Sequence, residues 1–370
     1  MSLERQILIW AATLAAAGYL LHALGSAVTP FAAGFALGYL LDPVVTRLER
    51  LGLGRLAASL TILAAFAIAA MLFLVLLAPI LSNQLIVFIQ NLPDYAMRLQ
   101  ALAVDQGNAI LRRVNSGWLN SLGLGASLTA EQVQKSVGDF VSQGARWLLD
   151  AARSLASGGA AVFSFFSLLV VTPVVAFYML VDWNKMIATI DGWLPLDHRD
   201  RLRVLARDID HALAGFIRGQ SLVCLFLGLW YGIGLTLIGL DFGFLIGLIA
   251  GVLSFIPYVG SLTALVLSLG VALVQGWPSM TLFFFALGVV GVGQFLEGNV
   301  VSPKLVGGSI GLHPVWLMFA LFAFGELFGF TGLLIAVPAA ATLGVLARHL
   351  IALYRKSPLY LGAASERIEP

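Results

Sequence analysis

Two glutamates lie within apolar stretches of the C-terminal half, where an ionised group is costly. Glu297 lies in the run QFLEGN, between Gln294 and Asn299, and Glu326 lies between FAFG and LFG. A charged side chain at the centre of a membrane helix costs about 3 kcal/mol on insertion scales, so one that is kept there is a candidate for chemistry. Either carboxylate can bind a proton, a cation or a polar group of a solute. Gln294 and Asn299 suit sugar-like hydroxyl groups. Alternatively, Glu297 faces water at an interface and Glu326 caps the amides of a broken helix.

Two long apolar runs in the same half are broken near their middles. Asp241–Leu273 is interrupted by IPYVG (Ile256–Gly260), and His313–Ala347 is interrupted by GELFG (Gly325–Gly329). A helix that simply crosses a bilayer has no need of such a break. Pairs of interrupted apolar segments are typical of substrate sites in transporters.

Pro257 accounts for the first break, because proline lacks an amide hydrogen and blocks a helical turn. Carbonyls that lose their partners are tolerated at membrane depth only where protein or a wet cavity surrounds them. We therefore expect Pro257, Tyr258 and Gly260 to line a polar site. In the second break, we expect Gly329 to line the polar site in the same way. A simple proline kink is the alternative at Pro257.

Three glycines form a four-residue ladder before the first break: Gly243, Gly247 and Gly251. Small residues at this spacing let another helix approach closely. The ladder predicts helix packing, and the alternative is a sliding face that lines the path of a solute. Glycine faces of this kind also predict a homo-oligomer.

Composition sets the class of protein that must position these residues. The chain has 370 residues, of which 60% are hydrophobic and 11% charged, with a mean hydropathy of +0.95. A soluble protein is about 25% charged. The apolar runs are continuous rather than alternating, so the sequence predicts an all-α integral membrane protein whose main partner is the lipid bilayer. A net charge of +2 argues against a nucleic-acid partner.

The single cysteine, Cys224, allows no intrachain disulfide or cysteine-based metal cluster, and we expect no cofactor and no metal site.

About eight membrane segments are expected, counting each interrupted run as one helical hairpin. The uninterrupted segments are Ile7–Leu24, Pro30–Leu41, Ala57–Ile80, Ala160–Val181, Leu213–Leu237 and Ser279–Leu296. Ile7–Leu24 is interpreted as a retained helix because it lacks a clear cleavage signature. The arm Phe242–Phe255 has about 14 residues, or roughly 21 Å of helix, which is short of the hydrocarbon thickness. We therefore expect a partial or strongly tilted arm.

The predicted organisation has five parts. They are an N-terminal transmembrane scaffold of three spans (1–81), an extracytoplasmic amphipathic helical region (82–157), a span with a basic cytoplasmic loop (158–212), a transport core with two broken hairpins (213–350) and a cytoplasmic tail (351–370). The second part is either a substrate-capturing domain or a packing and oligomerisation element.

Arginine and lysine in short loops predict the orientation. The segments 42–57 and 182–212 contain three and five arginine or lysine residues, so both termini are expected in the cytoplasm and region 82–157 outside. The two hairpins then enter from opposite sides, which is the outline of an inverted repeat. Arg218 lies about five residues into a span and is interpreted as snorkelling to the cytoplasmic headgroups.

Several stretches together resemble the autoinducer-2 exporter family of bacterial inner-membrane proteins. They are PFAAGFALGYLLDPVV (Pro30–Val45), GFIRGQ (Gly215–Gln220), FIPYVGSL (Phe255–Leu262), QFLEGNVVSPKLVG (Gln294–Gly307) and GLHPVWLMFALFAFGELFGFTGLLIAVPAAA (Gly311–Ala341). The resemblance implies a multi-spanning secondary transporter of the inner membrane. Members of the family export the quorum-sensing furanone autoinducer-2, and others are linked to exchange of sodium or lithium for protons.

The sequence therefore favours export of a small polar solute such as autoinducer-2 by alternating access, with both hairpins flanking one polar site. A sodium (lithium)/proton antiporter and a non-transporting membrane scaffold are the alternatives. The chain is not expected to be an enzyme, because it contains neither GxxxxGK[ST] nor HExxH. The segment Gly307–Gly311 satisfies G-x-S-x-G, but the α/β context of a nucleophile elbow is missing.

Overall fold

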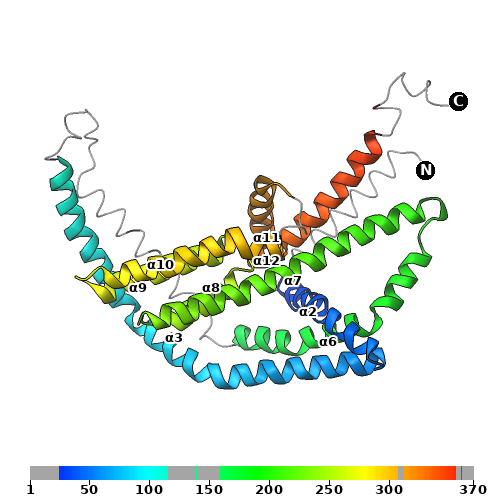
Figure 1. Ribbon diagram of the computed structural model, residues 1–370, viewed down its shortest axis with the longest axis horizontal. Coiled ribbons are helices and arrows are strands. Elements are labelled where there is room, and N and C mark those ends of the chain that lie inside the picture. Colours follow the sequence, from blue (N-terminus) through cyan, green and yellow to red (C-terminus); the bar gives the residue numbers. More distant parts are fainter. Residues whose placement is uncertain are drawn as a thin grey trace. The chain divides into compact units, whose positions relative to one another are not determined.

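The structure, a computed structural model, describes residues 25–115, 159–306 and 312–355, with the single positions 139, 143 and 360. Helices make up most of these residues (Figure 1), and seven of the helices described are long and apolar enough to cross a membrane. The predicted all-α, multi-span fold is confirmed. The predicted first span Ile7–Leu24, the GxSxG segment Gly307–Gly311 and most of region 116–158 lie outside the described residues.

The elements follow one another along the chain in this order. They are α2 (Gly25–Arg50), α3 (Arg55–Asn115), α6 (Gly159–Gly192), the 3-10 turn η1 (Leu196–His198), α7 (Arg199–Leu237), α8 (Gly243–Leu253), α9 (Val259–Gly276), α10 (Thr281–Leu296), the π-helix η2 (Glu297–Val301), α11 (Ser302–Leu305) and α12 (Pro314–Arg355).

Helices extend well beyond the predicted spans. The basic segment 42–57 is mostly helical, since α2 continues to Arg50 and α3 begins at Arg55. The Arg55 guanidinium lies 2.9 Å from carboxylate oxygens of both Asp42 and Glu49. Arg55 also donates to the carbonyl of Leu180 at 2.7 Å. These charges were expected in a loop, but residues such as Arg, Leu and Glu are good helix formers and continue the apolar helix.

The predicted boundary between residues 81 and 82 falls inside a helix. α3 is continuous over 61 residues and contains Pro79 and Pro93. A proline removes one backbone hydrogen bond, but long helices can absorb that loss as a local kink. The first part of the polar region therefore continues the preceding span as one helix.

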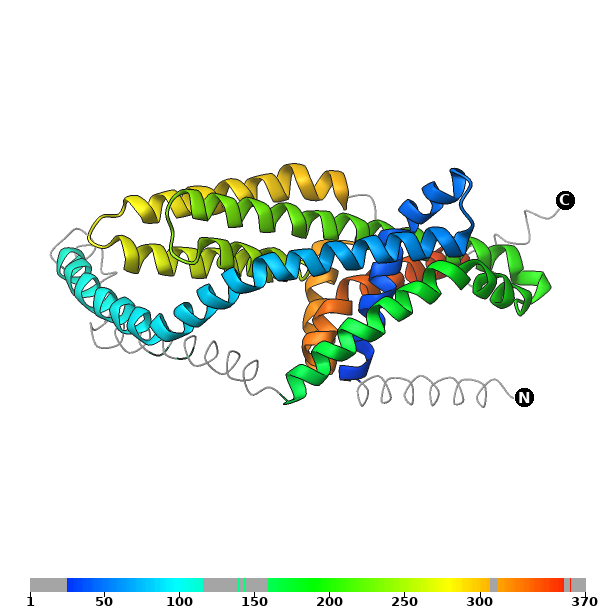
Figure 2. The same ribbon diagram turned by 90° about the horizontal axis from the view of Figure 1, so that it is seen from below.

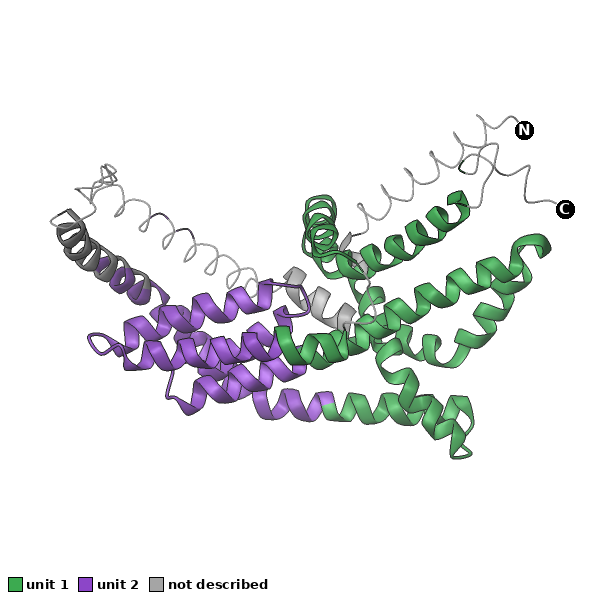
Figure 3. Cartoon of the chain, turned by 45° about the horizontal axis from the view of Figure 1, so that its top comes forward, with its two compact units in different colours: residues 1–69, 164–223, 298–370 green, residues 70–163, 224–297 purple. Residues whose placement is uncertain are grey.

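The chain forms two compact units (Figure 3). Unit 1 comprises residues 1–69, 164–223 and 298–370, and unit 2 comprises residues 70–163 and 224–297. α3, α6 and α7 each contribute to both units.

Unit 2 contains the first predicted hairpin. α8 and α9 pack side by side, and α10 packs on α9 (Figure 2). The linker between α8 and α9 is a series of tight turns, in which Ile256 N–H donates to the Leu253 carbonyl at 3.0 Å and Val259 N–H to the Ile256 carbonyl at 3.2 Å. These bonds partly replace the helical bonds that Pro257 prevents. α8 has 11 residues, or roughly 16 Å of helix, too short to cross the hydrocarbon.

The glycine ladder lies against the second half of α7. A Cβ added to Gly247 would collide with the backbone of Gly232, and one added to Gly251 would collide with the backbone of Gly228. Gly243 approaches the Leu235 backbone in the same way. The two backbones therefore approach as closely as small-residue packing allows, with α7 and α8 antiparallel.

Unit 1 contains the second predicted hairpin, within α12. Gly329 interrupts the helix with φ 59° and ψ −140°, a conformation that favours glycine. A Cβ on Gly332 would collide with the carbonyl of Phe324. Residues eight positions apart lie about 12 Å apart along a straight helix, so this contact shows that the chain turns back on itself. Pro338, in contrast, remains helical, and Thr342 donates to its carbonyl at 2.9 Å.

The rest of unit 1 packs α2 against α6. Gly34 lies against Val175 and Gly38 against Met179. The hydroxyl groups of Thr29 and Thr331 are 3.0 Å apart and connect α2 to the second arm of α12. This arm is therefore attached to α2 directly after the break.

Candidate functional site

Four polar side chains of unit 2 form one hydrogen-bonded group, which we call the Glu297 network: Tyr231, Ser261, Gln294 and Glu297. Gln294 Nε2 donates to Glu297 Oε2 at 3.1 Å and to the Tyr231 hydroxyl at 2.8 Å. Ser261 Oγ donates to the same Glu297 oxygen at 3.3 Å. The network joins α7, α9 and the end of α10.

Close packing between α7 and α10 fixes the position of Tyr231. Tyr231 is completely buried, and a Cβ added to Gly293 would come within 2.5 Å of its ring. Trp230 Nε1 donates to the carbonyl of Val289 at 3.0 Å. A buried tyrosine hydroxyl needs a polar partner, and Gln294 supplies it.

The first hairpin break places Ser261 beside the carboxylate. Ser261 is in the first turn of α9, directly after Gly260. Gly260 is buried against the backbone of Ser254, where no side chain would fit. Tyr258 adopts the left-handed conformation, with φ 69°, and is exposed. Pro257 is half-buried beside it. The break thus brings Gly260 near Glu297, whereas the Tyr258 side chain lies on the surface.

A π-helix begins at Glu297. The α-helical pattern of α10 ends at Leu296, and residues Glu297–Val301 form the wider π turn. π-helical turns in membrane and soluble proteins are frequent at functional sites. Asn299 belongs to the same turn and is exposed.

The electrostatics of the network distinguish Glu297 from carboxylates such as Asp42 and Asp191. Among the residues that the structure describes, Glu297 has no ion-pair partner, and the recorded donors to it are the neutral groups of Ser261 and Gln294. Asp42 and Asp191, in contrast, face arginines. A half-buried carboxylate with neutral neighbours can take up a proton, a monovalent cation or a hydroxyl-bearing solute.

The second break presents a different surface. Glu326 and Gly329 are both exposed in unit 1. Glu326 therefore occupies the broken segment that the sequence indicates, without the enclosure seen at Glu297. The single polar site shared by both hairpins remains a prediction.

Sequence reasoning missed Tyr231 and Ser261. Ser261 was visible within FIPYVGSL as the hydroxyl that follows the break, and Tyr231 as a tyrosine in an apolar span that needs a hydrogen-bond partner. Nothing in the sequence indicated that both would meet Gln294 and Glu297.

A second polar group lies in unit 1, around Tyr39. Its hydroxyl donates to Asp210 at 2.9 Å, and Arg218 Nε donates to its backbone carbonyl at 2.9 Å. A small cavity of about 60 Å³ is lined by Tyr39, Asp210 and Arg218, together with Asp42. Arg218 was interpreted as snorkelling to the headgroups, but its Nε is held by α2.

These observations define the class: a multi-pass, all-α membrane protein whose broken helices and hydrogen-bonded carboxylate are typical of transporters. The family model described as AI-2E family transporter matches residues 7–352. YrrI of Bacillus subtilis (strain 168), a candidate transport protein, is 31% identical over 322 residues, which cover 87% of this chain and 86% of the relative. PerM of Escherichia coli (strain K12), a candidate permease, is 25% identical over 316 residues, covering 85% and 84%.

The chain therefore belongs to the AI-2E transporter family. Membership of this family supports the conclusion that the chain is a multi-pass membrane protein with a role in membrane transport.

Proposed function

We propose that this protein is a secondary transporter that exports a small polar solute such as autoinducer-2 by alternating access, and that the Glu297 network binds the solute. The observation that carries the proposal is the Glu297 carboxylate, held by Gln294 and Ser261 beside a broken helix. Carboxylate, amide and hydroxyl groups together can accept and donate hydrogen bonds to a compound rich in hydroxyl groups.

The broken hairpin gives this site its position. Discontinuous helices place backbone polar groups within the membrane only where protein or a cavity surrounds them. Ile256 is 2% exposed and Gly260 is buried, so both ends of the turn of the first hairpin are enclosed by protein, whereas Tyr258 between them is exposed. A solute that enters beside Ser261 would meet polar groups there instead of lipid.

A second candidate function is exchange of sodium or lithium for protons. The same carboxylate favours it, because Glu297 lacks a cationic partner among the described residues. Such a group can be neutralised in turn by a proton and by a monovalent cation. The remaining alternative, a scaffold without transport, has the glycine packing of α7 and α8 in its favour.

We also place the protein in the bacterial inner membrane as a homo-oligomer, with both termini in the cytoplasm. The family membership supports the membrane location, and the arginine and lysine residues of segments 42–57 and 182–212 support the orientation. The homo-oligomer rests on the glycine faces alone. A protease-accessibility assay on inside-out vesicles tests the orientation of the C-terminal tail.

Transport assays with the purified full-length protein test the function. Proteoliposomes preloaded with autoinducer-2 should release it faster than empty-membrane controls, and Glu297→Gln should lower the rate at least tenfold. A second set of proteoliposomes measures proton movement driven by sodium or lithium gradients. Asp197→Asn is the control, because Asp197 is exposed in the turn before α7.

These assays distinguish the three candidate functions. Autoinducer-2 release that depends on Glu297 supports the first function, and cation-driven proton flux that depends on Glu297 supports the second. If both activities are absent while the protein remains folded, the scaffold interpretation replaces them. Transport that is unchanged in Glu297→Gln would remove the network from the mechanism.

A further inference from the structure

Side chains of α3 hold the turn between α7 and α8, which runs from Gly239 to Phe242, in a contact that we call the α3 clasp. Its members all lie in unit 2, and they are Gln84, Phe88, Tyr95, Asp241, Phe242 and Leu245. None of them belongs to the Glu297 network. The α3 residues come from region 82–157, whose role the sequence leaves open between substrate capture and packing.

The first turn of α8 is capped by Gln84 of α3. Phe242, the residue before the helix, makes no side-chain cap, and the first α-helical bond runs from Ile246 N–H to the Phe242 carbonyl at 2.9 Å. The Leu245 amide therefore precedes the regular bonds of the helix and needs an acceptor from elsewhere. Gln84 Oε1, 161 residues earlier in the chain, accepts from it at 3.2 Å. A bond that the local sequence usually supplies at a helix N-terminus comes here from another helix.

Two aromatic rings of α3 hold Phe242. Its backbone is left-handed, with φ 59°, which is uncommon for a residue with a large side chain. The Phe88 and Tyr95 rings lie 5.2 and 6.3 Å from the Phe242 ring, both edge-to-face. The Tyr95 hydroxyl also donates to Asp241 Oδ2 at 3.4 Å. The contacts with α3 thus stabilise a turn whose backbone conformation is unfavourable by itself.

The turn is attached to α9 more firmly than to α3. Gln275, near the end of α9, accepts from the Asp241 amide at 2.8 Å and donates to the Gly239 carbonyl at 2.9 Å. The clasp bonds, at 3.2 and 3.4 Å, are longer than the common lengths of about 2.9 Å for N–H···O and about 2.7 Å for O–H···O. The glycine ladder joins α8 to α7 through close backbone contacts. α7, α8 and α9 therefore form one tight body, to which α3 is joined by weaker side-chain contacts.

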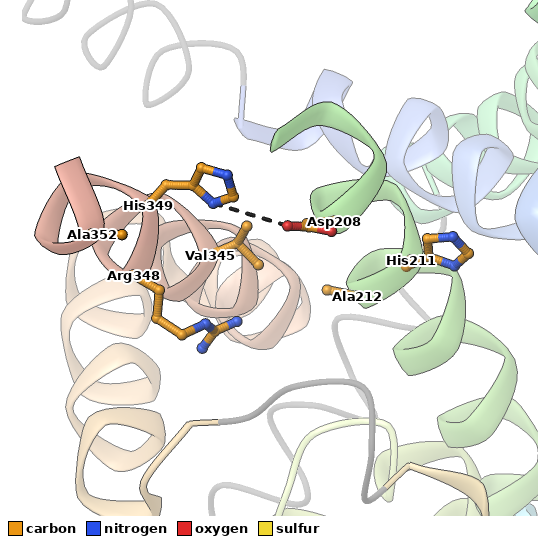
Figure 4. Close-up of a pocket in the computed structure, with 7 residues that line it drawn as sticks. All are labelled: Asp208, His211, Ala212, Val345, Arg348, His349 and Ala352. Carbon is orange, nitrogen blue, oxygen red and sulfur yellow. Dashed lines mark ion pairs between the residues drawn. The ribbon is translucent and has the colours of Figure 1, made fainter. Parts of the chain in front are cut away.

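A helix contact in unit 1 shows how a firmer joint between two helices is built. α7 and α12 pack through Ala212, Val345 and Ala341, which are 5%, 4% and 0% exposed. Ala212 and Val345 also line a cavity of about 610 Å³, where the Asp208 carboxylate faces His349 at 3.9 Å (Figure 4). In the α3 clasp, by contrast, the three α3 side chains are only half-buried. Burial of apolar surface therefore holds the clasp less strongly than it holds the α7–α12 joint.

We propose that the α3 clasp closes the path between the Glu297 network and the extracytoplasmic side, and that it opens to release the solute. This inference rests on the proposed transport function and orientation. In that orientation the α7–α8 turn lies at the outer end of α7, and Ser261 of the network lies at the opposite end of α9 from Gln275. A solute that leaves the network therefore passes along α9 to the clasp. α3 releases the turn while α7, α8 and α9 keep their packing.

A reversible cross-link across the clasp tests this motion. In a Cys224→Ser background, which removes the only cysteine of the chain, Phe88→Cys and Phe242→Cys are joined by a short bifunctional methanethiosulfonate. The cross-link should lower autoinducer-2 release at least tenfold, or the cation-driven proton flux if that is the activity found. A reductant should restore the rate, because it separates the two cysteines.

The matched control joins two residues of one helix. Trp316→Cys and Phe319→Cys replace rings that are 6.1 Å apart, and both lie in the first arm of α12. Their cross-link ties no two helices together, so it should change the rate less than twofold. A clasp cross-link that leaves transport as fast as in the reduced protein overturns the proposal, while the transport itself upholds the proposed function.

Hydrogen–deuterium exchange of the first turn of α8 tests the clasp without a solute. Gln84→Met removes the acceptor of the Leu245 amide and should speed exchange there at least fivefold. Gln84→Glu should restore slow exchange, because a carboxylate accepts the bond and suits a helix N-terminus. Gln90→Met is the control, since Gln90 is exposed on the same helix. Equal exchange in Gln84→Met and Gln90→Met overturns the proposal, even if the double-cysteine variant does not fold.

The two measurements separate failure of the proposed function from failure of the clasp. If the wild-type protein shows neither autoinducer-2 release nor cation-driven proton flux, the proposed function fails, and exchange alone decides on the clasp. Cross-linking should then slow exchange in the first turn of α8 at least fivefold relative to the reduced protein. Equal exchange before and after cross-linking would mean that the clasp does not open, and this outcome overturns the proposal.

Discussion

The two broken hairpins solve the same backbone problem with different residues. In unit 2, the chain leaves α8, passes Pro257 and enters α9 with Tyr258 in the left-handed conformation. In unit 1, Gly329 alone interrupts α12. Each turn is closed by a glycine that allows close backbone approach, Gly260 in the first and Gly332 in the second.

The hairpins differ in what surrounds their carboxylates. Glu297 lies beside the first turn and accepts hydrogen bonds from Ser261 and Gln294. Glu326 lies in the helical arm of α12 just before the break at Gly329 and is exposed. An interrupted helix is therefore not sufficient to make a polar site, because the neighbouring helices must also supply donors. This difference leads us to place the main binding role at the first hairpin.

The largest expected effect is on stability, and it tests the close glycine contact that closes the turn of each hairpin. Gly260→Ala and Gly332→Ala should each cost about 2–3 kcal/mol, since the added methyl group meets backbone atoms that cannot move aside. We expect a lower yield of monodisperse protein and a lower thermal midpoint. Gly288→Ala is the control, because nothing lies within 4 Å of its added Cβ. Gly260→Ala as stable as the control would show that the turn is looser than described.

The next effect separates the two carboxylates. Glu297→Gln should lower solute transport at least tenfold, because a neutral amide cannot bind a proton or cation in the same way. Glu326→Gln should change the rate less than twofold. Initial rates in proteoliposomes, normalised to the amount of reconstituted protein, measure both. The reverse order of effects would transfer the binding role to the second hairpin.

A smaller effect concerns the support of Gln294 by Tyr231. Tyr231→Phe removes the hydroxyl that accepts from Gln294 Nε2, at a cost of about 1 kcal/mol for one lost hydrogen bond. Transport should fall roughly threefold to fivefold, with little change in folding. Tyr178→Phe serves as control, since Tyr178 is 60% exposed in α6. Equal activity of the two variants would mean that Gln294 is held without Tyr231.

The smallest effect distinguishes the conformations of the two turns. Tyr258→Gly should raise the free energy of unfolding by about 1 kcal/mol or less, and with it the thermal midpoint slightly, because it relieves a left-handed tyrosine. Gly329→Ala should lower the midpoint, because its φ of 59° with ψ of −140° is unfavourable for alanine. Differential scanning fluorimetry in detergent measures both. Shifts of the same sign would contradict these backbone conformations.

Local sequence encodes the breaks well. Proline without an amide hydrogen and glycines that tolerate unusual φ angles act on the residues next to them, so IPYVG and GELFG indicate interruptions without knowledge of the rest of the fold. The extent of the helices is harder to predict. The charged residues around Arg47 and Arg50 were assigned to a loop, yet they continue α2 to its end at Arg50.

The composition of Gln294-Phe-Leu-Glu297 identified polar residues in an apolar run, but it did not identify their partners. Tyr231 and Ser261 come from two other helices, and they reach Gln294 and Glu297 because close glycine contacts such as Gly293 against Tyr231 fix how those helices pack. The π turn at Glu297 likewise depends on surrounding contacts as well as on the residues that form it.

The sequence by itself determined that this chain is a helical membrane protein with two interrupted segments, because hydrophobicity and backbone stereochemistry act over short distances. Only the tertiary structure decided that Glu297 is surrounded by neutral donors whereas Glu326 is exposed. The physical reason is that hydrogen bonds between side chains need groups within about 3 Å, and helix packing alone brings together residues that are far apart in the chain.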